Sequence, residues 1–232
     1  MLNRPQLALV GSRNNSRQGG ENAFRFARKL SRAGFVITSG LALGIDTQCH
    51  LGALAATGQT VAVLGTGIDV VYPMRNKKLF ENIVERGAIV TEFPLGSRPN
   101  RYCFPKRNRI ISGMSLGVLV VEAARKSGSL ITARCALEHG REVFSIPGSI
   151  HNTGSHGCHS LIQQGAKLVE NTSDILEELQ GWLTEVPLFE PGRPFLEPTS
   201  SSNQRLDIEP LDGRESRLIQ LLGHDPATIE LL

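Results

Sequence analysis

Short apolar runs alternate with longer amphipathic stretches along most of this chain. The apolar runs predict strands at 6–10, 35–38, 60–64, 88–91, 116–121, 142–145 and 167–169. The stretches between them predict a helix with the stripe Ala23, Phe26, Ala27, Leu30 and Ala33, and helices near 44–56, 76–86, 130–139, 155–164 and 173–179. Nearly continuous apolar strands that alternate with helices are typical of a parallel sheet. The pattern therefore predicts an α/β fold with a doubly wound, mostly parallel sheet and helices on both faces.

The pattern changes near residue 186. Residues 186–214 contain many prolines and the hydroxylic run Thr199–Ser202, so we interpret them as a Pro/Ser-rich linker. Residues 215–232, ESRLIQLLGHDPATIELL, show helical periodicity interrupted by a His-Asp-Pro turn. We therefore expect one α/β domain over 1–185, then the linker, then the start of a small helical domain that is cut short.

Composition limits the class of protein. The chain has 232 residues, is 40% hydrophobic and carries a net charge of only +3, so a charged ligand has to be bound through local clustering of charge. No apolar run is long enough to span a bilayer, and the start MLNRPQLALVGSR lacks a secretory core. The four cysteines are scattered without a CxxC pair, which favours reduced thiols. We expect a soluble cytoplasmic protein.

Small and hydroxylic residues follow several of the predicted strands. They form Gly11-Ser12-Arg13, Ser39-Gly40, Gly65-Thr66-Gly67 and, after a spacer, Ser127-Gly128-Ser129. In a doubly wound sheet the ligand binds at the carboxyl ends of the strands. Glycine lets backbone N–H groups approach an oxyanion closely, and the dipole of the following helix favours its negative charge. These loops predict a phosphate-binding rim along one edge of the sheet.

Several other kinds of site are disfavoured. The first strand is not followed by GxGxxG, and no Lys-Ser/Thr pair closes a glycine loop, which argues against nicotinamide binding and ATP hydrolysis. GMSLG at 113–117 precedes a strand, whereas a nucleophile elbow follows one. A glycine-rich loop carries His151, His156, Cys158 and His159. This loop lacks an i, i+4 pair and a plausible carboxylate partner, so we interpret it as a structural or interface loop. We predict no cofactor, no metal and no catalytic residue.

The most informative segment is the basic stretch between the fourth and fifth predicted strands, to which the periodicity assigns no element. No acidic residue lies between Phe93 and Val121. The stretch contains Arg98, Arg101, Lys106, Arg107 and Arg109, with Tyr102 and Phe104 among them. Cations and flat rings near a helix N-terminus suit a polyanionic ligand that bears bases. The stretch therefore predicts a nucleic-acid or nucleotide site.

The loop after the fifth strand adds to this site. We interpret Ser129 as the N-cap of a helix that begins at Leu130, with Lys126 adding a cation to the same amides. A pure capping role and a phosphate-binding role both remain open for Ser129. Glu122, at the end of the strand, is interpreted as a structural acceptor that anchors a loop rather than as a catalytic carboxylate.

Several motifs resemble those of the DNA-processing protein A (DprA/Smf) family. They are GSR at 11–13, TSGLALGID at 38–46, GTGID at 65–69, FPKRNRIISG at 104–113, VVEA and KSGSLITA within 120–133, VFSIPG at 143–148 and GCHSLIQQGA at 157–166. The resemblance implies an extended Rossmann-like domain that binds and protects single-stranded DNA without sequence preference. It also implies delivery of RecA recombinase onto the strand during natural transformation, and a homodimer. Family members usually carry a small helical domain before this part and a winged-helix-like one after it, so we expect the first to be missing and the second only begun.

The resemblance also implies roles for individual residues. The expected DNA-binding residues are Arg13, Ser39, Gly40, Phe104, Lys106, Arg107, Asn108, Arg109, Lys126, Ser127, Gly128 and Ser129. Among them the cations and the Ser127–Ser129 amides are expected to bind phosphates, and Phe104 is expected to stack on a base. The segment from Gly157 to Val169 is expected to mediate self-association.

Two other functions stay open at this point. The fold and the glycine loops also resemble the Lonely-guy phosphoribohydrolases, which cleave nucleoside monophosphates at the glycosidic bond. EAARKSGSLITA at 122–133 lacks the diglycine of that family and its glutamate at the matching spacing, so DNA binding is preferred over catalysis. The other alternative is a nucleotide-binding module, which predicts tight binding of a mononucleotide without preference for oligomers.

Overall fold

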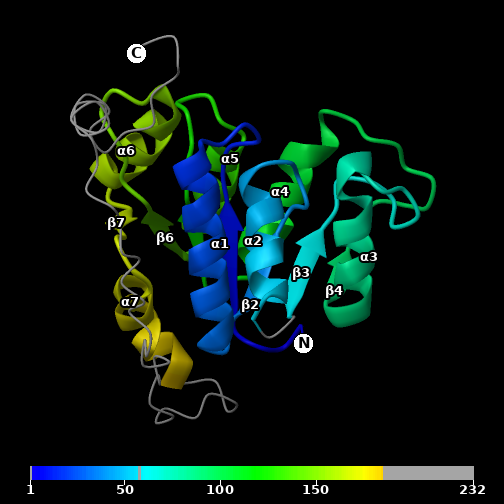
Figure 1. Cartoon of the computed structure of the whole chain (residues 1–232), viewed down its shortest axis with the longest axis horizontal. Helices are drawn as coiled ribbons and strands as arrows, with labels where there is room; N and C mark the ends of the chain where they lie inside the picture. The colour runs from blue at the N-terminus through cyan, green and yellow to red at the C-terminus, as the bar shows by residue number, and fades with distance from the viewer. Residues whose placement is uncertain (1, 57–58, 185–232) are drawn as a thin grey trace, which may run out of the picture. The chain divides into compact units, whose positions relative to one another are not determined.

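The computed structural model describes residues 2–56 and 59–184 (Figure 1). All of the described residues belong to one compact unit, Met1–Phe189. The predicted linker at 186–214 and the predicted helical segment at 215–232 lie outside the described residues. No helix in the described part has both the length and the apolar character needed to cross a bilayer.

Seven parallel strands form one sheet in the described part of the chain. They are β1 (Gln6–Val10), β2 (Val36–Ser39), β3 (Thr60–Val63), β4 (Ala88–Val90), β5 (Gly117–Val120), β6 (Glu142–Ser145) and β7 (Lys167–Leu168). Their order is β4-β3-β2-β1-β5-β6-β7, and all neighbours are parallel. The chain direction across the sheet reverses at β1 and β5, which is the switch point of a doubly wound sheet. The predicted Rossmann-like α/β fold is confirmed.

Helices cover both faces of this sheet (Figure 1). One face carries α1 (Arg17–Arg32), α2 (Ile45–Leu54), α3 (Lys77–Arg86) and α7 (Thr172–Thr184), and the other carries α4 (Cys103–Gly113), α5 (Ser129–Glu138) and α6 (His156–Gln163). Two 3₁₀ helices, η1 (Met74–Asn76) and η2 (Thr153–Ser155), precede α3 and α6. Successive residues of a strand point to opposite faces. In β1, Leu9 therefore shares a core with Phe26 of α1, whereas Val10 shares one with Ile111 of α4.

The basic stretch contains a helix that the periodicity did not predict. This is α4, which spans Cys103–Gly113. Pro105 lies in its first turn, where a proline is tolerated because those N–H groups have no acceptor within the helix. Phe104, Asn108 and Ile111 recur at intervals of three or four residues, and all three line the same pocket. The basic stretch is therefore a packed helix with one inner side, rather than a loop that presents all its cations alike.

Candidate functional site

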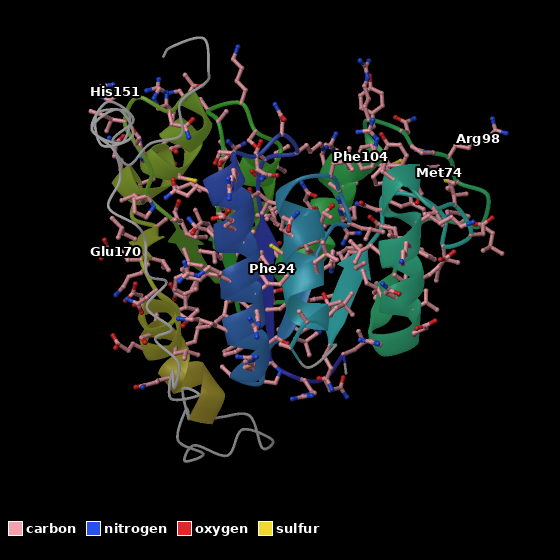
Figure 2. The ribbon with its side chains drawn as sticks, viewed as in Figure 1. Phe24, Met74, Arg98, Phe104, His151 and Glu170 are labelled. Carbon is pink, nitrogen blue, oxygen red and sulfur yellow. The ribbon has the colours of Figure 1, made fainter. Side chains whose placement is uncertain are left out.

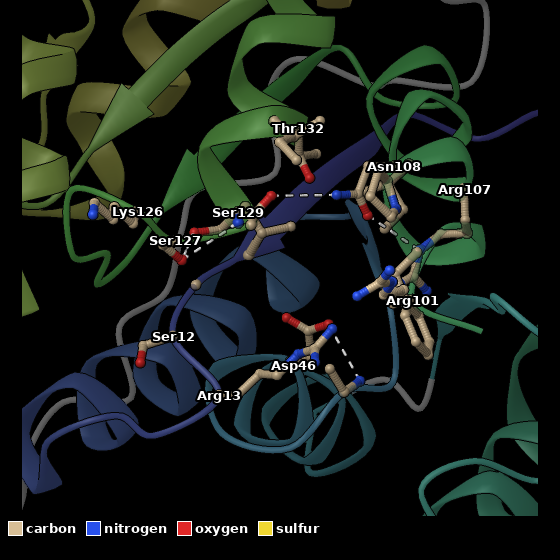
Figure 3. Close-up of a pocket in the computed structure, with 18 of the residues that line it drawn as sticks. Ser12, Arg13, Asp46, Arg101, Arg107, Asn108, Lys126, Ser127, Ser129 and Thr132 are labelled. Carbon is tan, nitrogen blue, oxygen red and sulfur yellow. Dashed lines mark hydrogen bonds between the residues drawn. The ribbon is translucent and has the colours of Figure 1, made fainter. Parts of the chain in front are cut away.

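A pocket of about 810 Å³ opens at the carboxyl ends of β1 and β5 (Figure 3). This is the switch point of the sheet, where loops that leave in opposite directions form a crevice. The walls come from the loop after β1, the start of α2, the loop before η1, the inner side of α4 and the loop before α5. The pocket lies within the size range of small-molecule sites in proteins.

Three cationic side chains form the exposed rim of this pocket: Arg13, Arg101 and Lys126. Figure 3 shows Lys126 on one side of the opening and Arg101 on the other. Within the described part of the chain, none of the three forms an ion pair. Asp46 is the one acid among the described lining residues. The exposed rim therefore presents positive charge that no ion pair neutralises in the part of the chain that the structure describes.

Phe104 forms an aromatic wall of the pocket. The guanidinium carbon of Arg13 lies over its ring, 5.2 Å from the centroid. The ring of Tyr72 lies 5.7 Å from that of Phe104, with 32° between the two planes. A Cβ added to Gly65 would come within 2.7 Å of Phe104 Cδ1, so the ring also packs closely against the loop after β3. The ring is held in a fixed place between these groups.

A buried carboxylate and a buried guanidinium, those of Asp46 and Arg107, join the strand ends behind the exposed rim. Asp46 is 7% exposed, and its Oδ2 accepts hydrogen bonds from the N–H groups of Gly40 at 3.1 Å and Ala42 at 3.3 Å. Arg107 is 4% exposed, and its Nη1 donates to the carbonyl oxygens of Gly40, at 2.8 Å, and of Val63. These bonds connect α4 to the carboxyl ends of β2 and β3.

Burial shifts the pKa of both groups. It raises the pKa of Asp46, and the positive charge of Arg107 partly offsets the shift. Burial lowers the pKa of Arg107 to about 10, with Asp46 opposing the shift and the charge of Arg13 adding to it. Arg107 therefore stays charged at neutral pH, and the two guanidinium groups repel each other. An anion bound between them relieves that repulsion.

The loop before α5 offers hydroxyl and backbone donors. Ser127 Oγ and Ser129 Oγ share a hydrogen bond of 2.7 Å, and Asn108 Nδ2 donates to the carbonyl oxygen of Gly128 at 3.3 Å. In the described part of the chain, no group accepts a hydrogen bond from the N–H of Gly128. Helix α5 begins at Ser129, so Gly128 occupies the N-cap position and the predicted capping role of Ser129 is wrong. A free N–H at a helix N-terminus favours an anion.

Most of the predicted DNA-binding residues meet at this pocket. Those that line it are Arg13, Phe104, Arg107, Asn108, Lys126, Ser127, Gly128 and Ser129. Arg107 differs from the others in that its guanidinium is already bonded to two carbonyl groups. The structure thus brings together residues from the end of β1, from α4 and from the loop before α5.

Two predicted residues, Ser39 and Gly40, lie behind the pocket wall and do not line it. Ser39 is fully buried, and its Oγ donates to the carbonyl oxygen of Leu9 at 2.6 Å. A Cβ added to Gly40 would lie 2.5 Å from the Arg107 guanidinium, so this glycine makes room for the buried arginine. Both residues support the wall, and in this structure neither reaches the pocket surface.

Lys106 and Arg109 do not line the pocket either. Each residue of an α-helix is rotated by about 100° from the one before it. Lys106 and Arg109 are therefore turned away from the side of α4 that carries Phe104 and Asn108, and both are exposed. Arg109 forms an ion pair with Glu92, which lies just before the acid-free stretch. The linear sequence placed these two cations in one group with Arg107, and the helix separates them.

Among the charged and aromatic lining residues, sequence reasoning did not single out Asp46 or Tyr72 and gave Arg101 no role. Asp46 lies inside the motif TSGLALGID, and Tyr72 is an isolated aromatic residue in the loop after GTGID. Arg101 was recognised as part of the basic stretch but was not assigned to the site. Nothing in the local pattern distinguishes Tyr72 from an ordinary loop residue. The acid in TSGLALGID was a usable signal, because a buried acid requires a cation.

The remaining candidates have structural partners. Glu122 is 6% exposed and accepts from the N–H of Ser16 at 3.0 and 3.2 Å, so it anchors the loop before α1. Ser115 is buried and donates to the carbonyl oxygen of Ile111 at 2.9 Å. His159 Nε2 lies 2.9 Å from the carbonyl oxygen of Gly148. Among the described residues, no three His, Cys, Asp or Glu side chains are grouped to hold a metal ion.

Comparisons with known proteins cover the α/β part of the chain. A family model, DNA recombination-mediator protein A, matches residues 1–180. Protein Smf of Escherichia coli (strain K12) is 54% identical over 186 residues, which are 78% of this chain and 50% of that protein. The chain therefore spans about half the length of this relative.

Two solved structures share the fold and part of the sequence. DNA processing protein A from Streptococcus pneumoniae superimposes with a TM-score of 0.72 at 49% identity, over 76% of this chain and 62% of that one. DNA processing protein A from Helicobacter pylori, whose structure concerns its single-stranded DNA binding mode, gives a TM-score of 0.71 at 29% identity. That match covers 78% of this chain and 82% of the Helicobacter pylori chain.

Proposed function

The chain belongs to the DNA recombination-mediator protein A family, and from this premise we propose that it binds and protects single-stranded DNA during natural transformation. The main support for the proposal is the exposed rim, because its three cations lack ion-pair partners among the described residues and surround a pocket with an aromatic wall. A flexible single strand presents both phosphates and base faces to such a surface, whatever its sequence. The likeness to the Helicobacter pylori protein, whose structure concerns single-stranded DNA binding, supports the proposal.

Each part of the pocket has a role in this proposal. Lys126 and the free N–H of Gly128 bind one phosphate, because a cation and a helix N-terminus both favour the negative charge. Arg13 and Arg101 bind neighbouring phosphates of the same strand. A base stacks on Phe104 once the guanidinium of Arg13 has moved from the ring. Arg107 adds positive potential from behind the wall without leaving its carbonyl partners.

A salt titration tests the proposal. Three phosphate contacts predict that the logarithm of the affinity for a fluorescent oligothymidylate falls with the logarithm of the salt concentration with a slope of about −2, at about 0.7 per contact. Arg13→Ala and Lys126→Ala each reduce the slope by about 0.7 and leave unfolding by urea unchanged. Lys29→Ala, an exposed cation of α1 outside the pocket, is the matched control. An affinity of the parent protein that does not depend on salt overturns the proposal.

The phosphoribohydrolase hypothesis needs a carboxylate that can act on a bound nucleotide. Asp46, the one acid among the described lining residues, is buried and accepts two backbone N–H groups. Glu122 is engaged with the loop before α1. These contacts favour binding over catalysis. Release of free base from nucleoside monophosphates by the parent protein, lost on Arg13→Ala, would instead support the enzyme.

The proposal extends to loading of RecA recombinase in the cytoplasm and to a homodimer, as the resemblance implies. The segment from Gly157 to Val169 includes β7, which is an edge strand of the described sheet, and Leu168 is 43% exposed there. An exposed strand edge is a surface on which a second copy can pair. Sedimentation of the parent protein and of Leu168→Arg tests the dimer, and a monomeric parent contradicts it. RecA filament assembly on covered single strands, with and without the chain, tests the loading.

A further inference from the structure

Tyr72 presents an aromatic surface at the edge of the pocket that the proposed function does not use. It lies between β3 and η1 and lines the pocket. The residue is 42% exposed. Its ring lies 5.7 Å from that of Phe104, and the two planes are inclined by 32°. Adjacent rings at the edge of a positively charged groove are a means of stacking successive bases of a single strand.

Tyr72 is the more accessible of these two rings. Phe104 is partly buried, with the guanidinium of Arg13 over the ring at 5.2 Å and the loop at Gly65 packed closely against it. A base that reaches Phe104 has to displace that guanidinium. No such displacement is needed for a base to contact the exposed part of Tyr72.

The loop that carries Tyr72 is anchored on both sides. Before it, Thr66 Oγ1 donates to the carbonyl oxygen of Val70 at 2.8 Å. After it, the buried Asn76 donates through Nδ2 to the carbonyl oxygen of Leu41 and to Thr47 Oγ1, at 2.9 Å in each case. These bonds limit the conformational entropy that the loop loses when a ligand binds. The aromatic ring is therefore presented from a fixed backbone.

The charges around Tyr72 suit a phosphodiester strand. Arg101, a member of the exposed rim, lines the same pocket. The acid of this loop, Asp69, accepts the N–H of Gly96 with both carboxylate oxygens, at 2.9 and 3.0 Å. Further along, Met74 is 66% exposed, and Figure 2 shows Phe104, Met74 and Arg98 toward the same edge of the molecule. Apolar contact surface and cations therefore continue beyond the pocket in this direction.

We propose that Tyr72 forms a second base-stacking subsite, so that a single strand continues from the pocket across the loop between β3 and η1. The occupant is the base next to the nucleotide held at Phe104, with its phosphate at Arg101. This inference rests on the proposed function, since it needs the strand to be in the pocket first. It adds a direction in which the strand leaves the pocket.

A length series of oligothymidylates tests the subsite. For a strand of about eight nucleotides, Tyr72→Ala lowers the affinity about five-fold or more, which corresponds to the loss of one stacked base. Tyr72→Phe keeps the ring and stays close to the parent. Leu137→Ala removes an exposed apolar side chain of α5 that does not line the pocket, and it serves as the matched control. For thymidine monophosphate, whose single base occupies the pocket at Phe104, Tyr72→Ala leaves the affinity unchanged.

A scan with a single abasic nucleotide, placed at each position of the longer strand in turn, gives a second readout. The parent loses affinity at the position stacked on Tyr72, and Tyr72→Ala is insensitive at that position. An equal loss for thymidine monophosphate and the longer strand overturns the subsite, because Tyr72 then only supports Phe104. An unchanged affinity of Tyr72→Ala, with Lys126→Ala still weakened, overturns the subsite and keeps the proposed function. A parent protein that does not bind the longer strand overturns both.

Discussion

Arg13 and Arg107 line the same pocket, yet their surroundings are opposite. Arg13 is exposed and touches the ring of Phe104. Arg107 is 4% exposed and donates to two carbonyl groups beside Asp46. If Arg13 is removed, water takes its place, whereas removal of Arg107 leaves buried polar groups without a partner. Whether a cation is available to a ligand therefore depends on how many protein groups it already satisfies, and not on its distance from the pocket alone.

The same contrast divides the whole site. The exposed rim, Arg13, Arg101 and Lys126, has charge that a ligand can neutralise. The buried framework, which we define as Asp46, Arg107 and Asn108, connects α4 to the strand ends and to the loop before α5. Changes in the exposed rim are expected to alter binding and its salt dependence. Changes in the buried framework are expected to alter the free energy of unfolding.

The largest expected effect is that of Arg107→Met. Removing the guanidinium leaves the buried carboxylate of Asp46 without the positive charge that offsets its burial, and it leaves two carbonyl groups without their donor. An uncompensated buried charge of this kind lowers the free energy of unfolding by about 3–5 kcal/mol. Urea denaturation measures it, with Lys126→Ala as the control that should match the parent. The double variant Arg107→Met with Asp46→Asn should lose less free energy of unfolding than the sum of the two single losses, because the uncompensated carboxylate is gone. If Arg107→Met is as stable as the parent and binds DNA poorly, Arg107 acts like a member of the exposed rim.

A buried histidine is expected to make the free energy of unfolding depend on pH. His50 is fully buried on α2, where its Nδ1 lies 2.8 Å from Thr60 Oγ1 and its Nε2 has no partner among the described residues. Burial, and secondarily the charge of Arg107, lower the pKa of His50 from 6.5 to about 3. Between these values the unfolded chain binds the proton more readily than the folded one does, so the protein loses stability as the pH falls.

This acid sensitivity can be measured by urea denaturation at several pH values. His50 alone contributes a loss of up to about 1.4 kcal/mol per pH unit below its unfolded pKa, or roughly 2 kcal/mol between pH 6.5 and pH 5. His50→Asn, which keeps a donor for Thr60, should flatten the dependence in this interval. His151→Gln, at an exposed position, should leave it as it is in the parent. If the free energy of unfolding depends on pH identically in His50→Asn and in the parent, His50 is not the source of the acid sensitivity.

The smallest expected effects are on DNA binding. They compare a cation of the exposed rim, Lys126, with a cation on the outer side of α4, Lys106. Lys126→Ala should weaken oligothymidylate binding about five-fold at 0.1 M salt, as expected for one lost phosphate contact. Lys106→Ala, which removes an exposed lysine outside the pocket lining, should change the affinity by less than about two-fold. Fluorescence anisotropy under matched salt measures both. Equal losses in the two variants would mean that the strand also follows the outer side of α4.

The strands and most helices could be predicted from the sequence because their apolar spacing is a local property. The strand at Gln6–Val10 and the strand at Glu142–Ser145 have the predicted boundaries, and helix α5 begins one residue before Leu130. Helix α4 could not be predicted in the same way. Its inner side holds a charged residue, Arg107, where a core-facing helix normally carries an apolar one.

The candidate site was predictable in part for the same reason. Arg13, Lys126 and Phe104 stand next to strand ends or in the basic stretch, and local sequence was enough to single them out. The burial of Arg107 depends on Asp46, which lies on a different helix and far away in sequence. Tyr72 reaches the pocket only because its loop is anchored beside α2 by Asn76. Such contacts form only in the tertiary structure, so the local sequence pattern does not predict them.

Under the proposed function, the contact between Arg13 and Phe104 couples recognition of the two components of a nucleotide. Without a ligand, the guanidinium shields part of the ring from water. A base that takes its place releases the guanidinium toward the phosphate of the same strand, and the exchange is favourable because base stacking contributes about 1–3 kcal/mol against about 0.5–1 for an exposed cation–π contact. Inorganic polyphosphate can attract Arg13 but cannot replace it on the ring. On this proposal, the site prefers polymers that supply charge and flat rings together.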